Sequence, residues 1–125
     1  MTAATDAGEI VLVEGSPSAC ADARHNLRNR TATIVESAVE RWTAVPADLV
    51  IADPARQGLG RDGVRALVAT GCAVLVLVSC DPVSLARDAA LLGTEGLVHA
   101  GSVVLDAFPH TPHVEVVTRF ERENG

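Results

Sequence analysis

Cys80 stands at a position where a thiol can act as a nucleophile. The apolar run of residues 73–78 and then Ser79 come directly before it. Asp81-Pro82, a pair typical of a helix start, comes directly after it. Unpaired backbone N–H groups at a helix N-terminus favour an anion such as a thiolate, whereas the Asp81 carboxylate opposes one by like-charge repulsion. We interpret Cys80 as a candidate nucleophile rather than as a small buried hydrophobe.

Three carboxylates occupy positions suited to binding or proton transfer. Glu14 and Asp53 each follow a short apolar run, and Glu115 lies between two valines near the C-terminus. A carboxylate at the end of a strand can accept hydrogen bonds from sugar hydroxyls, and one in a cleft can act as a general base. Glutamate is unfavourable in strands, so a functional role for Glu115 is favoured over an exposed strand carboxylate.

The segments that position these side chains alternate between strand and helix patterns. Strands are expected at residues 9–13, 32–35, 48–52, 73–78, 97–105 and 113–120, and helices after Ser16-Pro17, from an Asp62 cap to Gly71, and from Asp81-Pro82 to Gly93. In the last helix, Leu85, Ala89 and Leu92 fall on the predicted buried stripe. The alternation predicts an α/β fold with a mostly parallel sheet and a C-terminal antiparallel hairpin.

Length and composition limit the function classes. The chain has 125 residues, of which 48% are hydrophobic, which predicts a single domain over residues 1–125 with an ordered core at about 9–120. No apolar run approaches the ~20 residues that span a bilayer, so no membrane partner and a cytoplasmic location are expected. The net charge of -6 opposes autonomous binding to phosphate backbones.

Three segments together resemble the C-terminal signatures of the S-adenosylmethionine-dependent RNA uracil-5-methyltransferases. They are Asp53-Pro54-Ala55-Arg56; Val78-Ser79-Cys80-Asp81-Pro82 with Leu85-Ala86-Arg87-Asp88; and Phe108-Pro109-His110-Thr111-Pro112-His113-Val114-Glu115. The resemblance runs from about Glu9 to the C-terminus. It implies a partial Rossmann-like class I methyltransferase fold, S-adenosyl-L-methionine as cofactor, and methylation of uridine C5 in a tRNA or rRNA substrate.

The resemblance also implies a role for five residues. Cys80 would add to C6 of the uracil ring and so make C5 nucleophilic, and Glu115 would then remove the C5 proton. Asp53 would face the reactive end of the cofactor or the target base. Glu14 would accept hydrogen bonds from the cofactor ribose, and Ser37 would stand at the adenine-contacting position, where the family usually has an acidic or amide residue.

The chain departs from the family pattern in ways that bear on activity. Nothing before Glu9 resembles the first strand and glycine-rich turn with which the family's catalytic fold begins, and Asp81 replaces the more usual asparagine. The missing strand lies centrally in the intact fold, so its neighbours would expose unpaired edges. We therefore expect the fragment to be inactive alone, with cofactor binding weak or absent. The gap in the sheet is expected to close by direct pairing of the flanking strands or through a second chain, which is either a copy of this one in a homodimer or a complementing N-terminal chain.

Other interpretations remain open from the residues alone. The chain is either an enzyme of this kind or a non-catalytic α/β interaction module derived from one. A cysteine hydrolase pairing Cys80 with His110 or His113 is disfavoured, because no oxyanion-hole glycine run accompanies the thiol. His110, His113 and Glu115 fit no standard zinc spacing, so no metal site is expected, and Cys20 and Cys72 are expected to be reduced, buried thiols.

Overall fold

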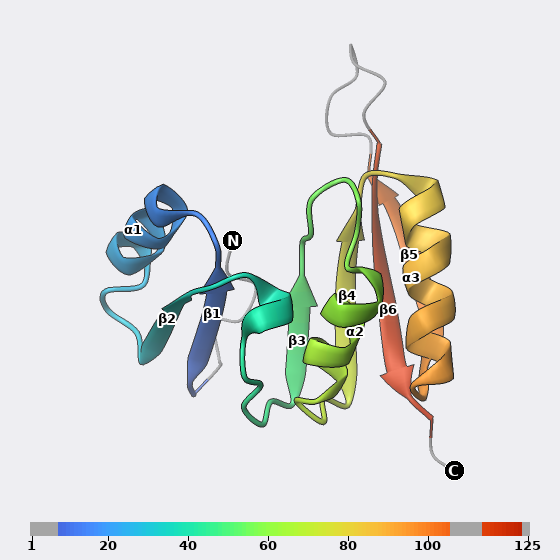
Figure 1. Ribbon diagram of the computed structural model, residues 1–125, viewed down its shortest axis with the longest axis horizontal. Helices are drawn as coiled ribbons and strands as arrows, with labels where there is room; N and C mark the ends of the chain where they lie inside the picture. Colours follow the sequence, from blue (N-terminus) through green and yellow to red (C-terminus); the bar gives the residue numbers. More distant parts are fainter. Residues whose placement is uncertain (1–7, 106–113, 124–125) are drawn as a thin grey trace. The chain divides into compact units, whose positions relative to one another are not determined.

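A computed structural model describes residues 8–105 and 114–123 of the chain (Figure 1). Its elements divide between two compact units, Met1–Trp42 and Thr43–Gly125. Each unit has its own hydrogen-bonded sheet, β1-β2 in the first and β3-β4-β6-β5 in the second. The single domain over residues 1–125 remains a prediction.

The first unit is a strand–helix–strand motif. It contains β1 (Ile10–Glu14), α1 (Pro17–Asn26), β2 (Ala32–Glu36) and the 3₁₀ helix η1 (Val39–Arg41). The two strands are parallel and in register, so that Glu14 pairs with Glu36. Ser16 caps α1, because its hydroxyl accepts the Ala19 N–H at 3.4 Å, and the predicted cap and first-turn proline are confirmed.

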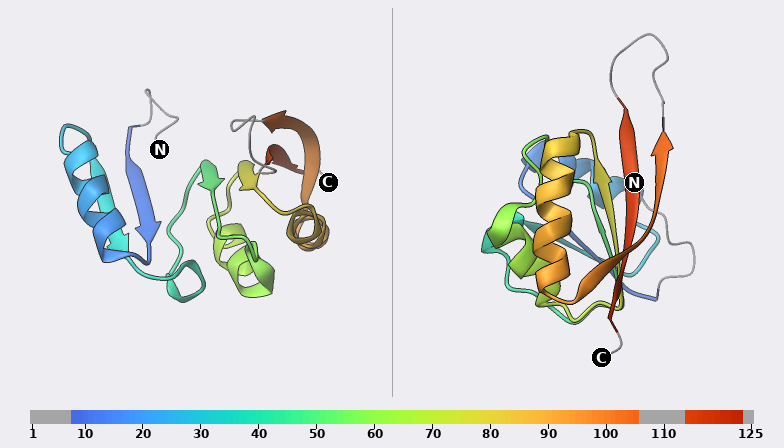
Figure 2. Two further views of the ribbon diagram at one scale, coloured as in Figure 1. Left: turned by 90° about the horizontal axis from the view of Figure 1, so that it is seen from above. Right: turned by 90° about the vertical axis from the view of Figure 1, so that its right-hand side faces the viewer.

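The second unit is a four-stranded mixed sheet with two helices. Its elements are β3 (Leu49–Ala52), α2 (Gly60–Val68), β4 (Val74–Ser79), α3 (Pro82–Thr94), β5 (Leu97–Leu105) and β6 (Glu115–Arg122). Strand β3 is parallel to β4, and β6 runs antiparallel between β4 and β5. Both helices cover the same face of this sheet (Figure 2). Because β5 and β6 are adjacent and antiparallel, the predicted C-terminal hairpin is confirmed.

The core of the second unit lies between β4 and its two helices. Leu75 and Leu77 of β4 are fully buried, while Val74 and Val76, which point to the other face, are only partly buried. The side chains that complete this core are Val64, Leu67, Leu92, Leu97 and Phe120. Removing this apolar surface from water, at about 1.5–3 kcal/mol for each large side chain, holds β4 and the start of α3 in place.

Two helix predictions need correction. Asp62 does not cap α2, which begins two residues earlier at Gly60 and lacks a side-chain cap. In α3 the buried positions are Ser84, Asp88 and Leu92, whereas the predicted stripe residues Leu85 and Ala89 are only partly buried. The polar side chains of Ser84 and Asp88 are buried because the loop before α2 carries backbone groups that need hydrogen-bond partners. Among the helices of the described residues, none is long and apolar enough to cross a membrane.

Candidate functional site

Cys80 and Glu115 lie at the same end of neighbouring strands. Strands β4 and β6 are paired as far as Ser79 and Val116, and continuing this antiparallel register by one residue brings Cys80 opposite Glu115. Opposite residues of such a pair have Cα atoms about 4.5–5.5 Å apart, with side chains on one face. Cys80 is exposed and Glu115 is partly buried. The thiol and the carboxylate can therefore both reach a group placed at this edge.

Asp53 lies at the same edge of the sheet. It follows Ala52, the last residue of β3, which pairs in parallel with Leu77 of β4. The carboxyl ends of the two strands therefore point to one side, and Asp53 is exposed there. In open α/β sheets ligands bind outside the carboxyl ends of the strands. The second unit thus gathers Asp53, Cys80 and Glu115 around one candidate binding edge.

The turn after Cys80 is held by the cap of α3. Asp81 has extended backbone angles, and its carboxylate accepts the Val83 N–H at 3.1 Å and contacts the Ser84 hydroxyl at 3.2 Å. Pro82 is the first helical residue. The carboxylate of Asp81 is thereby directed at the helix N-terminus, where a negative charge is favourable. This cap fixes the backbone on the C-terminal side of the thiol.

Glu14 and Ser37 lie together in the first unit, at the carboxyl ends of β1 and β2. The Ser37 N–H donates to the Glu14 carbonyl at 3.0 Å. Oε1 of Glu14 accepts the Ser16 N–H at 3.0 Å, and the Ser37 hydroxyl donates to the Ala38 carbonyl at 2.8 Å. A carboxylate has acceptor positions for several donors, and a hydroxyl that donates its proton keeps its lone pairs. Both side chains can accept further hydrogen bonds.

The three thiols differ sharply in access. Cys20 and Cys72 are fully buried, whereas Cys80 is exposed. The Cys20 thiol donates to the Glu14 carbonyl at 3.3 Å, and burial, reinforced by the charge of Glu36, raises its pKa above the usual 9.0. The expectation that Cys20 and Cys72 are buried structural thiols agrees with this placement.

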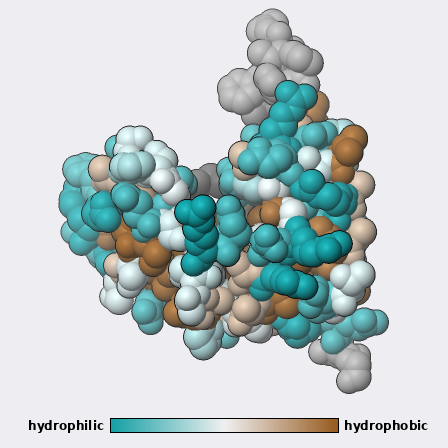
Figure 3. Space-filling model, viewed as in Figure 1, coloured by the Kyte–Doolittle hydropathy of each residue, from teal (hydrophilic) through white to brown (hydrophobic). Residues whose placement is uncertain are grey.

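The surface around α2 and α3 is mainly hydrophilic, with smaller apolar areas (Figure 3). A pocket here is lined by Gly60, Arg61, Asp62, Arg87 and Leu91, so it does not include the predicted site residues. No group of histidine, cysteine and carboxylate side chains suited to a metal ion occurs within residues 8–105 and 114–123. His110 and His113, which entered the metal and hydrolase alternatives, lie outside the described residues.

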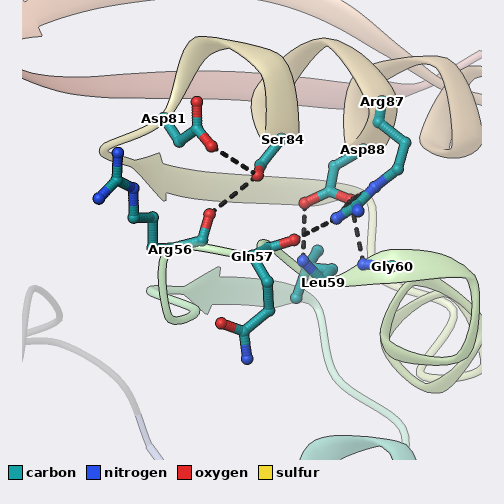
Figure 4. Close-up of polar contacts among 8 residues, drawn as sticks. All are labelled: Arg56, Gln57, Leu59, Gly60, Asp81, Ser84, Arg87 and Asp88. Atoms are coloured by element: carbon teal, nitrogen blue, oxygen red, sulfur yellow. Dashed lines mark hydrogen bonds and ion pairs between the residues drawn. The ribbon is translucent and has the colours of Figure 1, made fainter.

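Three side chains of α3 that contact the loop after Asp53 were not predicted from the sequence. Ser84, Arg87 and Asp88 of α3 contact the loop between β3 and α2 (Figure 4). Arg87 and Asp88 belong to the Leu85-Ala86-Arg87-Asp88 segment, which carries part of the family resemblance. The available signal was the spacing of four between Ser84 and Asp88, which places two polar residues on one helix face.

Comparison with known proteins places this geometry in context. An RNA methyltransferase of Streptomyces avermitilis whose function is uncharacterised is 36% identical over 121 residues, which are 93% of this chain and 28% of that protein. A 23S rRNA (uracil(1939)-C(5))-methyltransferase of Yersinia enterocolitica is 36% identical over 129 residues, 95% of this chain and 29% of that protein. No protein-family model matches the chain.

Solved structures agree. The Pyrococcus abyssi tRNA (uracil-54, C5)-methyltransferase, solved with S-adenosyl-L-homocysteine, superposes with a TM-score of 0.79 at 33% identity, over 90% of this chain and 28% of that one. The chain is related to the RNA uracil-C5 methyltransferases. An N-methyltransferase from Bradyrhizobium japonicum superposes with a TM-score of 0.71 at 16% identity, which shows the class I methyltransferase fold alone.

This relationship confirms the predicted resemblance and fold class. The chain spans 28% of the length of the Streptomyces avermitilis RNA methyltransferase and 29% of the length of the Yersinia enterocolitica uracil-C5 methyltransferase. The alternation of strands and helices, the antiparallel C-terminal hairpin and the parallel pairs β1-β2 and β3-β4 are those of a partial Rossmann-like fold.

Proposed function

We propose that the chain is the part of an RNA uracil-C5 methyltransferase that carries the nucleophile and the base. The observation that supports this proposal is the register of β4 and β6, whose last pair is Ser79 with Val116, so that the exposed Cys80 and Glu115 directly follow that pair at one sheet edge. The names of the relatives and the solved tRNA methyltransferase support uridine in tRNA or rRNA as the substrate class.

The proposed reaction begins at Cys80. Its thiolate sulfur forms a bond to C6 of uracil, and the electron pair of the C5–C6 double bond moves to C5 and the O4 carbonyl. S-adenosyl-L-methionine, when bound, would supply an electrophilic methyl group to C5, with cleavage of its methyl–sulfur bond and S-adenosyl-L-homocysteine as the leaving group. The Glu115 carboxylate then takes the C5 proton, the C5–C6 double bond re-forms, and the sulfur leaves as thiolate. Asp53 borders the same edge and orients the base or the methyl donor.

The first unit supports a cofactor role for Glu14 and Ser37. The remaining acceptor positions of the Glu14 carboxylate suit the two hydroxyls of a ribose, and the Ser37 hydroxyl can accept from an amino group such as that of adenine. These contacts fit the nucleoside part of S-adenosyl-L-methionine. Ser37 offers a weaker contact than a carboxylate, because hydrogen bonds to charged groups are stronger.

Activity is expected only together with the rest of the catalytic domain. The Streptomyces avermitilis relative contains a part that this chain does not match. We call that part the complementing polypeptide. The chain alone is expected to bind S-adenosyl-L-methionine weakly or not at all, and its mixture with the complementing polypeptide is expected to bind it. Titration calorimetry of the chain, the complementing polypeptide and their mixture measures this difference.

The chemistry is tested on the same mixture. RNA transcripts labelled with tritium at uridine C5 should release tritium to water in the presence of S-adenosyl-L-methionine, because the C5 proton is lost once the methyl group is added. The Cys80→Ser variant should release none. Release by Cys80→Ser at the rate of the unsubstituted chain would refute the proposal. Cofactor binding without release by either protein would favour the alternative, a non-catalytic α/β interaction module.

A further inference from the structure

A buried carboxylate in α3 is bonded to the loop that follows Asp53. The Asp88 side chain is only 1% exposed. Its Oδ2 accepts the Leu59 N–H at 2.7 Å, and its Oδ1 accepts the Gly60 N–H at 3.1 Å. These contacts join residues 29 and 28 positions apart in the chain. A buried carboxylate requires such partners, since leaving it unpaired would be strongly unfavourable.

Two neighbours of Asp88 extend the contact along the same loop. Arg87 forms an ion pair with Asp88 Oδ1 at 3.2 Å, and its guanidinium also donates to the Gln57 carbonyl. One turn earlier in α3, the Ser84 hydroxyl donates to the Arg56 carbonyl at 2.8 Å. Figure 4 shows all three side chains directed at the loop. Backbone groups of three loop residues, Arg56, Gln57 and Leu59, and of Gly60 at the start of α2 are therefore bound to α3.

The same helix begins directly after the candidate nucleophile. Ser84, which bonds to Arg56, also contacts the Asp81 carboxylate at 3.2 Å, and Asp81 follows Cys80 in the chain. The loop at its other end begins with Asp53. Gly58 leaves no spare room, because a Cβ atom there would collide with the Asp88 carboxylate. The loop and the Cys80 turn are thus attached to a common support.

We propose that Asp88 is a positioning residue that holds the loop of residues 53–59 against α3 and thereby fixes Asp53 relative to Cys80. Arg87 and Ser84 assist it in the middle of the loop, where they bind the carbonyls of Gln57 and Arg56. This inference rests on the proposed function, in which Asp53 and Cys80 act at one sheet edge. It assigns a role to the Arg87-Asp88 pair, which touches neither candidate catalytic residue.

Amide hydrogen exchange of the 125-residue chain tests the support directly. In Asp88→Asn, an amide NH₂ replaces one carboxylate oxygen and faces a backbone donor. We expect the Leu59 and Gly60 amides to exchange about tenfold to a hundredfold faster, and the faster exchange to extend to Gly58, whose N–H donates to the Ala55 carbonyl. The amides of the β4–β6 ladder should keep their protection. The matched control is Asp22→Asn, which neutralises an exposed carboxylate of α1.

A milder variant keeps the test decisive if Asp88→Asn does not fold. Ser84→Ala removes only the hydroxyl that binds the Arg56 carbonyl, so exchange should rise at Gly58, whose N–H donates to the Ala55 carbonyl, and stay unchanged at Leu59 and Gly60. Unchanged loop exchange in both variants would overturn the proposal. An equal loss of protection throughout the second unit would also overturn it, because Asp88 would then support the whole fold rather than position the loop.

Activity with the complementing polypeptide separates this inference from the proposed function. Asp88→Asn should lower kcat for tritium release about tenfold or more per folded molecule, with the S-adenosyl-L-methionine Kd changed less than about twofold. Full kcat in Asp88→Asn, beside an active unsubstituted chain, would remove the positioning role. If the unsubstituted mixture releases no tritium, the proposed function fails, and hydrogen exchange still decides whether Asp88 holds the loop.

Discussion

At the scale of single residues, access distinguishes the three thiols. Cys80 is exposed, while Cys20 and Cys72 have no accessible surface, and burial raises the pKa of Cys20. A thiol reacts as its thiolate and must meet the reagent, so both burial and a raised pKa slow it. This contrast makes Cys80 the thiol available for addition to a nucleobase.

We therefore predict selective alkylation. At pH 8, iodoacetamide should modify Cys80 at least about tenfold faster than Cys20 or Cys72, because the latter react only after local opening. Peptide mass spectrometry over a time course gives the three rates. The Cys80→Ser variant serves as control and should lack the fast phase. Modification of Cys20 or Cys72 as fast as that of Cys80 would contradict the burial described here.

Glu115 is expected to act late in the reaction. In the complemented protein, Glu115→Gln should still allow sulfur addition and methyl transfer, but the C5 proton should stay in place. We expect a covalent protein–RNA complex to accumulate and turnover to fall by about 10²–10⁴-fold. Gel mobility of labelled RNA under denaturing conditions measures the complex.

The matched control for Glu115 is Glu121→Gln. Glu121 is an exposed glutamate of the same strand, bound to Arg119 at 2.9 Å. Glu121 lies near the other end of β6, opposite Val74. The Glu121→Gln substitution should therefore leave turnover unchanged. Unimpaired turnover in Glu115→Gln would remove the proposed base, and equal accumulation in both variants would show that the effect is not specific to Glu115.

At the scale of elements, the site depends on where β6 is inserted. The C-terminal hairpin could be predicted from two apolar segments joined by a short loop, which is a local pattern. The sequence contained no local signal that β6 lies between β4 and β5, and this insertion brings Glu115 beside Cys80. The cap of α3 could also be predicted, because a helix cap depends on neighbouring residues, here Asp81 and Pro82.

The contacts of α3 with the loop were not predictable from local patterns. Periodicity assigns apolar residues to the buried stripe, so it selected Leu85 and Ala89 and passed over Ser84 and Asp88. Polar residues become buried where a distant backbone needs partners, which requires knowledge of segments about 28 residues away. The predicted Asp62 cap is wrong for the same reason, because the Gly60 N–H at the start of α2 donates to Asp88, 28 residues further along the chain.

Gly58 in this loop and Gly60 at the start of α2 offer a matched pair of substitutions. Gly58 and Gly60 both have positive φ, 77° and 68°, but only at Gly58 would a Cβ atom meet Asp88. Gly60→Ala should lower the free energy of unfolding by about 1–2 kcal/mol through backbone strain alone. Gly58→Ala should lower it by about 1–3 kcal/mol more, because Asp88 also loses its hydrogen bonds. Urea unfolding measures both, and equal losses would contradict the packing of Asp88.

At the scale of the whole molecule, the open edge of β3 is where further polypeptide is expected to join. Within the described ranges, β3 pairs only with β4, and its Leu49 and Ile51 are 47% and 40% exposed. An unpaired strand edge with exposed apolar side chains is a template for pairing with another strand. The chain covers 28% and 29% of the two named relatives, so each relative has further sequence beyond the matched part.

We predict that Ile51→Lys weakens association with the complementing polypeptide about tenfold or more, because the joined interface would bury an unpaired charge. The chain itself should keep its stability, since Ile51 is already exposed. Calorimetric titration gives the Kd. Val103→Lys on β5, which is 59% exposed, is the matched control and should bind normally. Normal binding by Ile51→Lys, or equal weakening by both, would place the junction elsewhere.

The central claim is that Cys80 forms the bond to uracil. It is tested most directly by mixing the complemented protein with S-adenosyl-L-methionine and RNA carrying 5-fluorouridine, whose C5 fluorine cannot leave as a proton, and by mapping the trapped nucleotide with peptide mass spectrometry. We expect the methylated 5-fluorouridine adduct on the peptide containing Cys80 and none in Cys80→Ser. An adduct on another residue, or one that persists in Cys80→Ser, would contradict the claim.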